Sequence, residues 1–393
     1  MQKIGVFGGT FSPIHNGHLR LAQAAREHFS LDMVLFIPSG FSYMKVDSDI
    51  LDAKTRLSMT RLAIADIPGF VVSDMEVMRP GPSYTCDTLR ELSKQYPGLQ
   101  IYYIVGSDTL HAMDAWKEPE YIFENTVVVV YARNDALPGQ KSDELTKKYG
   151  ADIRLIPGEP LDISSHWIRE KYYQGVDIAA LLPQSVLSHM DMERLGRLRC
   201  AVKEQLDGKR YEHSLGVCYM GAALAMCHGA DIRKAQMAGL LHDWAKAWAA
   251  DTLVEKCSDK GIPMRETERQ NPHLLHAKLG AHIVREQHNI MDTDILGAIE
   301  SHTTGRPGMT LLEKIIYVAD YIEPGRYKAP RLGVIREKAF CNLDAALLMI
   351  LEDSLEHLRA SGRAIDPMTV ETYEFYLKSV NLKREPKKIR GKT

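Results

Sequence analysis

The sequence lacks the features of several special protein classes. Its six cysteines include no CxxC pair and show no spacing typical of a disulfide framework, which favours reduced thiols and a cytoplasmic protein. No apolar run approaches the roughly 18 residues of a membrane-spanning helix, and the N-terminus has no signal-like basic and apolar regions. The net charge is only −2, so neither nucleic acid nor a membrane is an expected partner.

What the chain does contain is an ordinary globular composition, with 393 residues, 45% hydrophobic and 25% charged. This length favours two domains. Up to about residue 190, short β-rich runs alternate with amphipathic segments such as 51–67 and 84–96. Alternating βα units predict a Rossmann-like, doubly wound parallel sheet covered by helices on both faces. The expected strands are 3–9, 33–40, 69–76, 99–108, 125–133 and 152–158.

The second half follows a different pattern. From about residue 195 the β-rich runs stop, and apolar residues recur every three or four positions, which is typical of helices. The clearest helical segments are 212–229, 232–249, 311–322 and 343–362. We therefore expect an α/β domain over 1–192 and an all-α domain over 195–380. The basic end, 381–393, is expected to be a disordered tail.

The first predicted strand ends in "GGTFSPIHNGH", from Gly8 to His18. Ligands of doubly wound sheets bind beyond the carboxyl ends of the strands, where glycines let the backbone approach a phosphate. A helix that starts there also offers free N–H groups and a partial positive charge. His15 and His18, three residues apart, share one helix face and could reach one phosphate. The simpler alternative is a tight turn followed by a capped helix.

Two further strand ends carry similar residues. "VGSD" places Gly106 and Asp108 at the end of one strand, and "DISSHWIR" begins a helix after another. In the latter, Ser164 is expected to cap the helix beside Ser165, and Arg169 lies one turn later, where it could clamp a polyphosphate. Phosphate-binding chemistry is thus predicted at three strand ends.

Together these motifs resemble those of bacterial nicotinate mononucleotide adenylyltransferases, a branch of the HxGH nucleotidyltransferases. The resemblance covers residues 1 to about 190 and rests on "GGTFSPIHNGH", "RPGPSYTCDTL", "IVGSD", a downstream tryptophan and "ISSHWIR". It implies that the phosphate of nicotinate mononucleotide attacks the α-phosphorus of ATP, with Mg²⁺ across the phosphates and no covalent enzyme intermediate. His15 and His18 would hold the reacting phosphates.

The resemblance also implies a set of substrate-binding residues. Thr85 would meet the nicotinate carboxylate, and Trp116 would lie near the pyridine ring. One departure is "SGFSYMK" (39–45), where the family usually carries a Pro-Pro-His-Lys stretch, so that only Lys45 is kept. The implied substrate-binding residues are Gly8, Gly9, Thr10, Phe11, Lys45, Thr85, Gly106, Asp108, Trp116, Ser164, Ser165 and Arg169.

The helical half is rich in histidine, and the most informative pair is the His242–Asp243 doublet in "LLHDWAK". Two adjacent polar groups inside an apolar helix are expensive to bury unless something satisfies them. Imidazole and carboxylate together suit Fe, Mn or Zn. A lone histidine is more often structural than a metal ligand. The histidines without motif context are expected to be structural or surface residues: His28, His111, His189, His228, His273, His282, His288 and His357.

The order His, His-Asp, His, His, Asp resembles the two-metal branch of HD-domain phosphohydrolases, and "LLHDWAK", "HTTG" and "ADYIEPGR" resemble more narrowly the diadenosine tetraphosphate hydrolases of that family. The resemblance implies one or two metal ions and symmetric cleavage to two ADP. His213, His242, Asp243 and Asp320 would bind the tighter metal, with Asp243 also catalytic. His276 and His302 would complete a second metal site or meet phosphate. Lys246, Thr303, Arg306 and Arg326 could bind phosphate or be solvated surface residues.

The sequence therefore predicts a bifunctional enzyme that acts on ATP, nicotinate mononucleotide and dinucleoside polyphosphates. Two alternatives for the second half stay open, namely hydrolysis of another nucleotide and nucleotide sensing without turnover. The first half could also prefer nicotinamide mononucleotide or phosphopantetheine. The sequence leaves open whether the protein forms a homo-oligomer.

Overall fold

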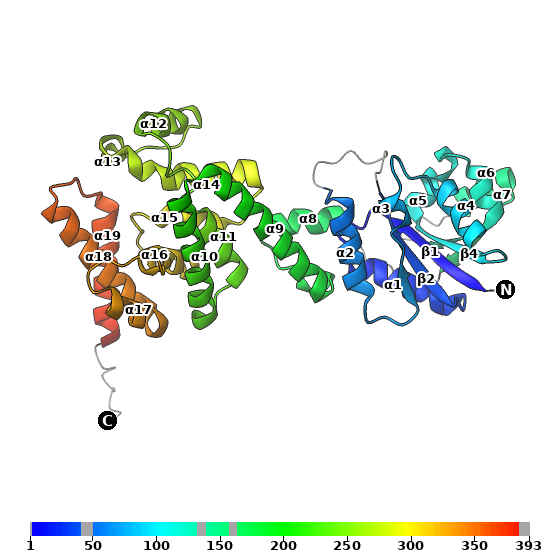
Figure 1. Ribbon diagram of the computed structural model, residues 1–393, viewed down its shortest axis with the longest axis horizontal. Coiled ribbons are helices and arrows are strands. Elements are labelled where there is room, and N and C mark those ends of the chain that lie inside the picture. Colours follow the sequence, from blue (N-terminus) through cyan, green and yellow to red (C-terminus); the bar gives the residue numbers. More distant parts are fainter. Residues whose placement is uncertain (1, 41–49, 132–138, 157–162, 385–393) are drawn as a thin grey trace, which may run out of the picture. The chain divides into compact units, whose positions relative to one another are not determined.

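The computed structural model describes residues 2–40, 50–131, 139–156 and 163–384 (Figure 1). The chain divides into two compact units. One comprises residues 1–172 and 176–190, and the other comprises 173–175 and 191–393. Helix α9 (Gln184–Gln205) supplies residues to both units. The boundary predicted between 192 and 195 falls inside this helix.

The first unit contains a six-stranded sheet in the order β3-β2-β1-β4-β5-β6. All of its neighbouring strands pair in parallel, which confirms the predicted Rossmann-like architecture. The strands are β1 (Lys3–Gly9), β2 (Met33–Pro38), β3 (Phe70–Val72), β4 (Gln100–Gly106), β5 (Thr126–Tyr131) and β6 (Asp152–Ile156).

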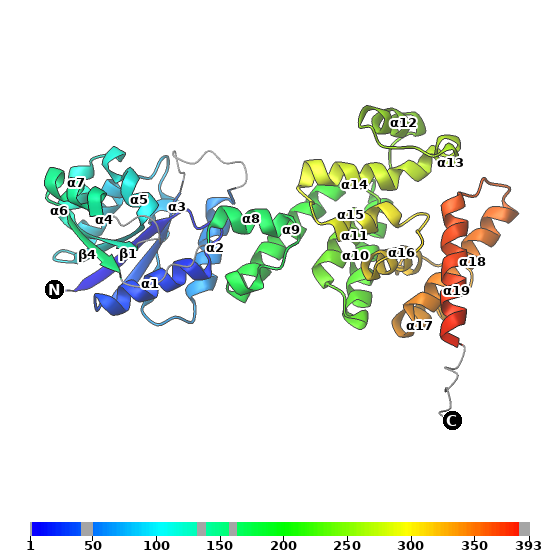
Figure 2. The same cartoon turned by 180° about the vertical axis from the view of Figure 1, so that it is seen from behind.

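The central strands are apolar on both faces because helices cover both sides of the sheet. In β5, Val129 packs into one core and its neighbours Val128 and Val130 pack into the other. The first core includes residues of α1 and α2, and the second includes residues of α4, α5, α6 and α7 (Figure 2). The helices of this unit are α1 (Asn16–His28), α2 (Ala53–Ile64), α3 (Met75–Met78), α4 (Thr85–Gln95), α5 (Ser107–Ala112), α6 (Pro119–Asn125), α7 (Gly139–Tyr149) and α8 (Ser165–Tyr173).

The second unit is helical, as predicted. Its core is one cluster to which α10, α11, α15 and α16 contribute Val217, Leu240, Ile299 and Ile316. The helices after α9 are α10 (Gly208–His228), α11 (Ile232–Leu241), α12 (Ala250–Asp259), α13 (Glu266–Gln270), α14 (Leu275–His288), α15 (Thr293–Ser301), α16 (Leu311–Ile322), α17 (Leu332–Cys341), α18 (Leu343–Ala360) and α19 (Pro367–Arg384).

Two details differ from the sequence-based expectations. Helix α11 ends at Leu241 and residues 242–247 form turns, so the prediction that His242 and Asp243 lie inside a helix is wrong. The polar doublet instead begins where the helix stops, and a C-terminal end leaves backbone carbonyls free to bind such side chains. Helix α19 continues through Arg384, so 381–384 of the predicted tail are helical, while 385–393 lie outside the described residues.

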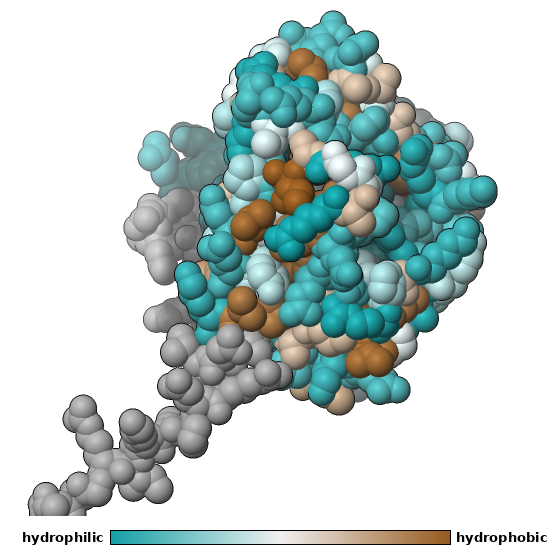
Figure 3. All heavy atoms as spheres, turned by 90° about the vertical axis from the view of Figure 1, so that its left-hand side faces the viewer, coloured by the Kyte–Doolittle hydropathy of each residue, from teal (hydrophilic) through white to brown (hydrophobic). Residues whose placement is uncertain are grey.

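The face of the second unit seen in Figure 3 is mostly hydrophilic, with separate apolar spots. Single exposed apolar residues of this kind are ordinary. Among the residues that the structure describes, no helix is both long enough and apolar enough to cross a membrane.

Candidate active sites

The loop after β1 lies at the switch point of the sheet. Strands β1 and β4 are neighbours at the centre of the order, and the chain continues from β1 toward one edge and from β4 toward the other. The crevice beyond their carboxyl ends is where open α/β sheets bind ligands. Gly9 ends β1 and Gly106 ends β4, so two of the motifs singled out in the sequence meet at this edge.

His15 and His18 lie against each other at the start of α1. Their ring centroids are 3.6 Å apart, and the backbone N–H of His15 donates to Nδ1 of His18 at 3.2 Å. A Cβ on Gly17 would lie 3.0 Å from Nδ1 of His15, so glycine leaves room for this ring. Because Nδ1 of His18 accepts a hydrogen bond, a neutral His18 carries its proton on Nε2, where it can be donated to a ligand.

The glycines before the histidines permit close contacts. A Cβ on Gly8 would lie 3.2 Å from the hydroxyl oxygen of Tyr103, and one on Gly9 would lie 3.0 Å from the ring of Phe11. Phe11 itself is buried and has a left-handed φ of 48°. The carbonyl of the intervening Thr10 accepts from Arg56 at 2.7 Å.

Arg56 is a residue that the sequence motifs did not identify. It is buried in α2, and besides Thr10 it donates to the carbonyl of Gly40 at 3.0 Å. Burial lowers its pKa, against the effects of Asp52 and Glu76. Arg56 thus joins the segments that follow β1 and β2. The segment after β2 continues into 41–49, so the predicted substrate-binding Lys45 lies outside the described residues.

The N-terminal turn of α8 supports the same loop. Ser165 donates through Oγ to the carbonyl of Pro13 at 2.9 Å, and Arg169 donates to the carbonyl of Ser12 at 2.7 Å. Ser164 accepts from the backbone N–H of Trp167 at 3.2 Å, as a helix cap does. Arg169 is buried, so it fixes the backbone of the loop that carries the two glycines and two histidines.

At the end of β4, Gly106 makes room for Asp108. A Cβ on Gly106 would lie 2.6 Å from the Oδ1 atom of Asp108. The carboxylate therefore folds back over the strand end, at the same edge of the sheet as the β1 loop.

Thr85 was predicted to meet the nicotinate carboxylate and Trp116 to lie near the pyridine ring, and both contact Tyr103. The Tyr103 hydroxyl lies 3.3 Å from Oγ1 of Thr85, and the rings of Tyr103 and Trp116 meet edge to face with centroids 6.3 Å apart. Burial raises the pKa of Tyr103 to about 12, so the hydroxyl stays protonated. Within the described residues, the buried Nε1 of Trp116 makes no hydrogen bond.

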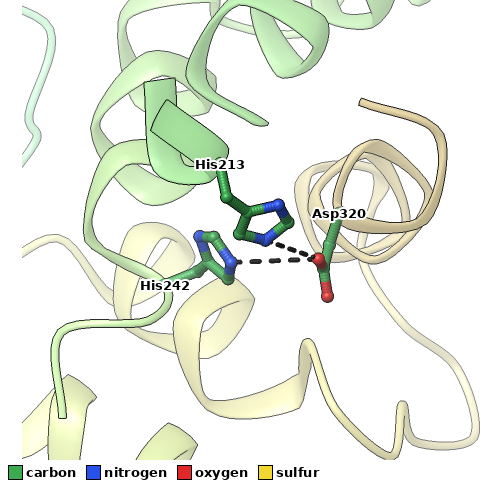
Figure 4. A group of neighbouring side chains, drawn as sticks. All are labelled: His213, His242 and Asp320. Atoms are coloured by element: carbon green, nitrogen blue, oxygen red, sulfur yellow. Dashed lines mark ion pairs between the residues drawn. The ribbon is translucent and has the colours of Figure 1, made fainter. Parts of the chain in front are cut away.

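In the second unit, His213, His242 and Asp320 converge from α10, the end of α11 and α16 (Figure 4). Nε2 of His213 lies 3.0 Å from Oδ1 of Asp320, and Nε2 of His242 lies 4.0 Å from the same oxygen. Three ligand atoms this close form a group that could hold a metal ion.

Asp243 connects this group to the two remaining predicted histidines. Its Oδ1 lies 3.1 Å from Nε2 of His276 and 3.4 Å from Nε2 of His302, and its Oδ2 lies 3.6 Å from Nε2 of His242. The two histidine Nε2 atoms are 3.1 Å apart. All six predicted metal ligands therefore belong to one cluster.

Three of the four rings are oriented in the same way. Nδ1 of His242 donates to the carbonyl of Gly239 at 2.7 Å, and Nδ1 of His302 donates to the carbonyl of Ile299 at 2.7 Å. Nδ1 of His276 contacts the carbonyl of His273. Each carbonyl lies three residues before its histidine. Because Nδ1 carries the proton in this tautomer, Nε2 presents a free lone pair to the cluster.

The cluster fits a divalent metal. Nε2 of His242 is fully buried and makes no hydrogen bond within the described part of the chain. Burial lowers the pKa of both His242 and His276 to about 4, so both rings are neutral at pH 7. Burial by itself would raise the pKa of Asp243. The combined effect of His242 and its other partners is larger and holds this pKa well below its usual range. Neutral imidazoles and a carboxylate are ligands that Fe, Mn and Zn accept.

The predicted phosphate-binding residues fall into two groups. Nζ of Lys246 lies 3.2 Å from Nε2 of His276, and Arg326 lies 3.1 Å from Oδ1 of Asp320, so both reach the cluster. Thr303 and Arg306 line a cavity of about 470 Å³, and Arg306 pairs with Glu313 at 2.7 Å. Arg306 is therefore held by a buried carboxylate on the wall of that cavity.

The sequence reasoning missed Glu323, whose Oε1 lies 3.2 Å from Nδ1 of His213. Its place in "ADYIEPGR", three residues after Asp320, was the only available signal. Two histidines without motif context have structural contacts, as His228 meets the carbonyl of Ala339 at 2.7 Å and His288 packs on Trp244.

Comparisons with known proteins give the same division of the chain. The cytidylyltransferase-like family matches residues 6–171, and the HD domain family matches residues 210–325. A Lachnoclostridium phytofermentans protein named a probable nicotinate-nucleotide adenylyltransferase is 40% identical over 193 residues, which cover 48% of this chain and 96% of that protein.

Two further proteins are similar to this chain, one over most of its length and one over about half of it. A Mycoplasma genitalium protein named a probable nicotinate-nucleotide adenylyltransferase/Ap4A hydrolase is 28% identical over 356 residues, which cover 89% of this chain and 97% of that protein. A crystal structure from Clostridium acetobutylicum, titled a "predicted HD superfamily hydrolase involved in NAD metabolism", is 37% identical. The match covers 47% of this chain and 97% of the Clostridium chain, with a TM-score of 0.46.

Proposed function

Since the chain belongs to the nicotinate-nucleotide adenylyltransferase family through its first half and carries an HD domain in its second, we propose that it is a bifunctional enzyme. The first unit transfers the adenylyl group of ATP to nicotinate mononucleotide and releases pyrophosphate. The phosphate oxygen of the mononucleotide forms the new bond to the α-phosphorus of ATP, and the bond from that phosphorus to the β-phosphate oxygen breaks. The product is nicotinate adenine dinucleotide.

The paired rings of His15 and His18, 3.6 Å apart at the switch point of the sheet, carry this proposal. Both imidazoles can contact one phosphate group, and His18 can donate from Nε2 because its Nδ1 already accepts. When bound with ATP, Mg²⁺ supplies charge neutralisation across the phosphates. The chain's own contribution is to position the phosphates and to stabilise their developing charge.

The loop from Gly8 to Phe11 is proposed to contact the phosphates through its backbone. Its conformation does not depend on the ligand alone, because Arg56, Ser165 and Arg169 bind its carbonyl oxygens or those of the next two residues. Donors aimed at a reacting group act best when they are held in place before the reaction. These three side chains therefore pre-organise the loop.

The pyridine is proposed to bind at Thr85, Tyr103 and Trp116. The aromatic edge of Trp116 gives an apolar wall, and α4 begins at Thr85, so the positive end of the helix dipole favours a carboxylate over an amide. Competition of nicotinate and nicotinamide mononucleotides at equal concentration tests this. If kcat/KM is equal for the two substrates, the assignment to the superfamily stands but the proposed specificity for nicotinate mononucleotide fails.

The second unit is proposed to hydrolyse dinucleoside polyphosphates, with diadenosine tetraphosphate giving two ADP. The name of the Mycoplasma relative, which pairs with 89% of this chain, supports this substrate class. The oxygen of one water forms a bond to one of the two central phosphorus atoms, and the bond from that phosphorus to the central bridging oxygen breaks. The bridging oxygen leaves with the other half, so that each product is ADP with two phosphates. The cluster of six possible metal ligands, with the positively charged side chains of Lys246 and Arg326 beside it, supports hydrolysis over binding without turnover.

His213, His242, Asp243 and Asp320 would hold the tighter metal ion, which is Fe, Mn or Zn by its ligand set. When bound, that ion would act as a Lewis acid, which could activate water and polarise the phosphate. His276 and His302 contact Asp243 and would hold either a second ion or the phosphate itself. Lys246 and Arg326 would bind the phosphates that flank the cleaved bond, because both already lie at the edge of the cluster.

Product analysis tests the second activity directly. With diadenosine tetraphosphate and the purified full chain, ADP should be the main product by ion-exchange chromatography. ATP plus AMP would mean asymmetric cleavage and a different placement of the substrate. No hydrolysis of any dinucleoside polyphosphate or nucleotide, despite bound metal, would favour the nucleotide-sensing alternative.

A further inference from the structure

His213 differs from the other three histidines of the cluster in the partner of its Nδ1 atom. His242, His276 and His302 each turn Nδ1 to a backbone carbonyl. His213 turns its Nδ1 to a carboxylate, with Oε1 of Glu323 at 3.2 Å. An ionised carboxylate is a stronger acceptor than a carbonyl. The Nδ1 partner of His213 therefore comes from outside its own helix, α10.

The carboxylate of Glu323 lies in a slot formed by two glycines. A Cβ on Gly216 would lie 2.6 Å from Oε2 of Glu323, and a Cβ on Gly325 would lie 2.9 Å from the same oxygen. The backbone N–H of Gly325 also contacts Oε2. The side chain of Glu323 is only 6% exposed. Any side chain at Gly216, one turn after His213 on α10, would displace the carboxylate.

The backbone that carries Glu323 is held as firmly as its side chain. Helix α16 ends at Ile322, and Glu323 follows it directly. From α17, Arg336 donates to the carbonyls of Ile322 at 3.0 Å, Glu323 at 2.8 Å and Arg326 at 2.9 Å. A single guanidinium thus fixes the turn, because its planar fork of donors can bind several acceptors at once.

We propose that Glu323 is the positioning residue of His213 and that it raises the affinity of the cluster for its metal. This inference rests on the proposed metal site. Glu323 keeps the proton of His213 on Nδ1, aims Nε2 at the position beside Asp320, and makes the ring a stronger donor. Outer partners of this kind typically change metal affinity about 10- to 100-fold.

The test measures binding of Mn²⁺ to the metal-free full chain, by competition with a chelator. Glu323→Ala should weaken binding about 10- to 100-fold. Glu323→Gln should weaken it less, because the amide oxygen can still accept from Nδ1 while the charge is lost. Gly216→Ala alters neither a proposed ligand nor Glu323 itself, yet it should weaken binding like Glu323→Ala.

Matched controls separate positioning from general damage. Gly333→Ala changes a glycine of α17 whose added Cβ would meet no atom within 4 Å, and Glu337→Gln changes an exposed glutamate of the same helix. Both should bind Mn²⁺ like the unmodified chain. Alanine favours helix over glycine, which offsets part of the cost of displacing Glu323, so Gly216→Ala should lower the melting temperature no more than Glu323→Ala does.

The outcomes distinguish this inference from the function on which it rests. If the unmodified chain does not bind Mn²⁺, Fe²⁺ or Zn²⁺, the proposed metal site itself fails. If the unmodified chain binds Mn²⁺, and Glu323→Ala and Gly216→Ala bind it equally well, the site stands and the role of Glu323 is overturned.

Discussion

Oδ1 of Asp243 lies 3.1 Å from Nε2 of His276. Asp243 follows the end of α11 and His276 lies in the first turn of α14, so this contact joins two segments that are separated by α12 and α13. It places the His-Asp doublet at the centre of the cluster, between the group around Asp320 and the group around His302. The carboxylate of Asp243 is therefore the one whose removal should disturb both.

Replacing Asp243 by alanine should abolish hydrolysis of diadenosine tetraphosphate and reduce the metal content of the purified protein. Adenylyl transfer by the first unit should stay near its normal rate, because that site is built from other residues. Elemental analysis and product chromatography measure the two effects, with Asp259→Ala, an exposed aspartate of α12, as the control. The cluster would only hold helices together if the unmodified protein contains no transition metal and a chelator leaves its hydrolysis of diadenosine tetraphosphate unchanged.

Replacing His18 by alanine should lower kcat for adenylyl transfer by about 10²–10³, the usual cost of losing one contact made in the transition state. The fold should survive because His18 is only partly buried. Steady-state rates with ATP and nicotinate mononucleotide check this. His28→Ala, at the other end of α1, serves as the control and should be near normal. A nearly normal rate in His18→Ala would remove this residue from the mechanism.

Tyr103→Phe should raise KM for nicotinate mononucleotide about 2- to 10-fold with little change in kcat. The reason is that Thr85 loses its partner at 3.3 Å, and a neutral hydrogen bond contributes about 0.5–1.5 kcal/mol. Tyr102→Phe is a matched control, because Tyr102 is the preceding residue of β4 and packs into the other core. Equal changes in both variants would mean a general loss of strand packing.

His288 should titrate below its ordinary pKa of 6.5, because burial against Trp244 disfavours its charged form. Above pH 6.5 both folded and unfolded chains carry a neutral ring, and the full contribution to stability is present. As the pH falls below 6.5 the unfolded chain takes up the proton first, so this contribution decreases. An NMR titration, with the signal assigned by His288→Gln, checks the midpoint. A midpoint at or above 6.5 would contradict the expectation.

The two units should work separately. Met190 belongs to the core of the first unit, and Leu198 belongs to that of the second, so each keeps its own core after a cut between Met190 and Asp191. A chain of residues 1–190 should transfer adenylyl groups, and one of 191–393 should hydrolyse dinucleoside polyphosphates. The second piece should melt below the full chain, because it lacks Tyr173, whose carbonyl accepts from Met291. Loss of either activity in the isolated pieces alone would mean that the site needs the whole chain.

Much of the fold could be predicted from the sequence because its signals are local. The run "TVVVVY" of β5 is apolar on both faces, as only a strand covered on both sides can be. The pair His15 and His18 was predicted to meet on one helix face. The two rings do meet, but His15 precedes the helix as its N-cap residue, with an extended φ of −142°, and contacts His18 as in a capping box. From the residues alone only the His242–Asp243 doublet suggested a metal, and the full set of His213, His242, Asp243, His276, His302 and Asp320 was implied by the resemblance to HD-domain phosphohydrolases.

What only the tertiary structure decided are the partners that come from distant segments. Nothing local indicates that Tyr103 meets Thr85, that Arg56 binds the carbonyl of Thr10, or that Glu323 supports His213. These contacts depend on which strands and helices pack together, and burial then requires each polar group to find whatever partner that packing supplies. The end of α11 was decided in the same way. The pattern of apolar residues continues past Leu241, but the helix stops there, since His242 and Asp243 reach their partners from a turn at the helix end.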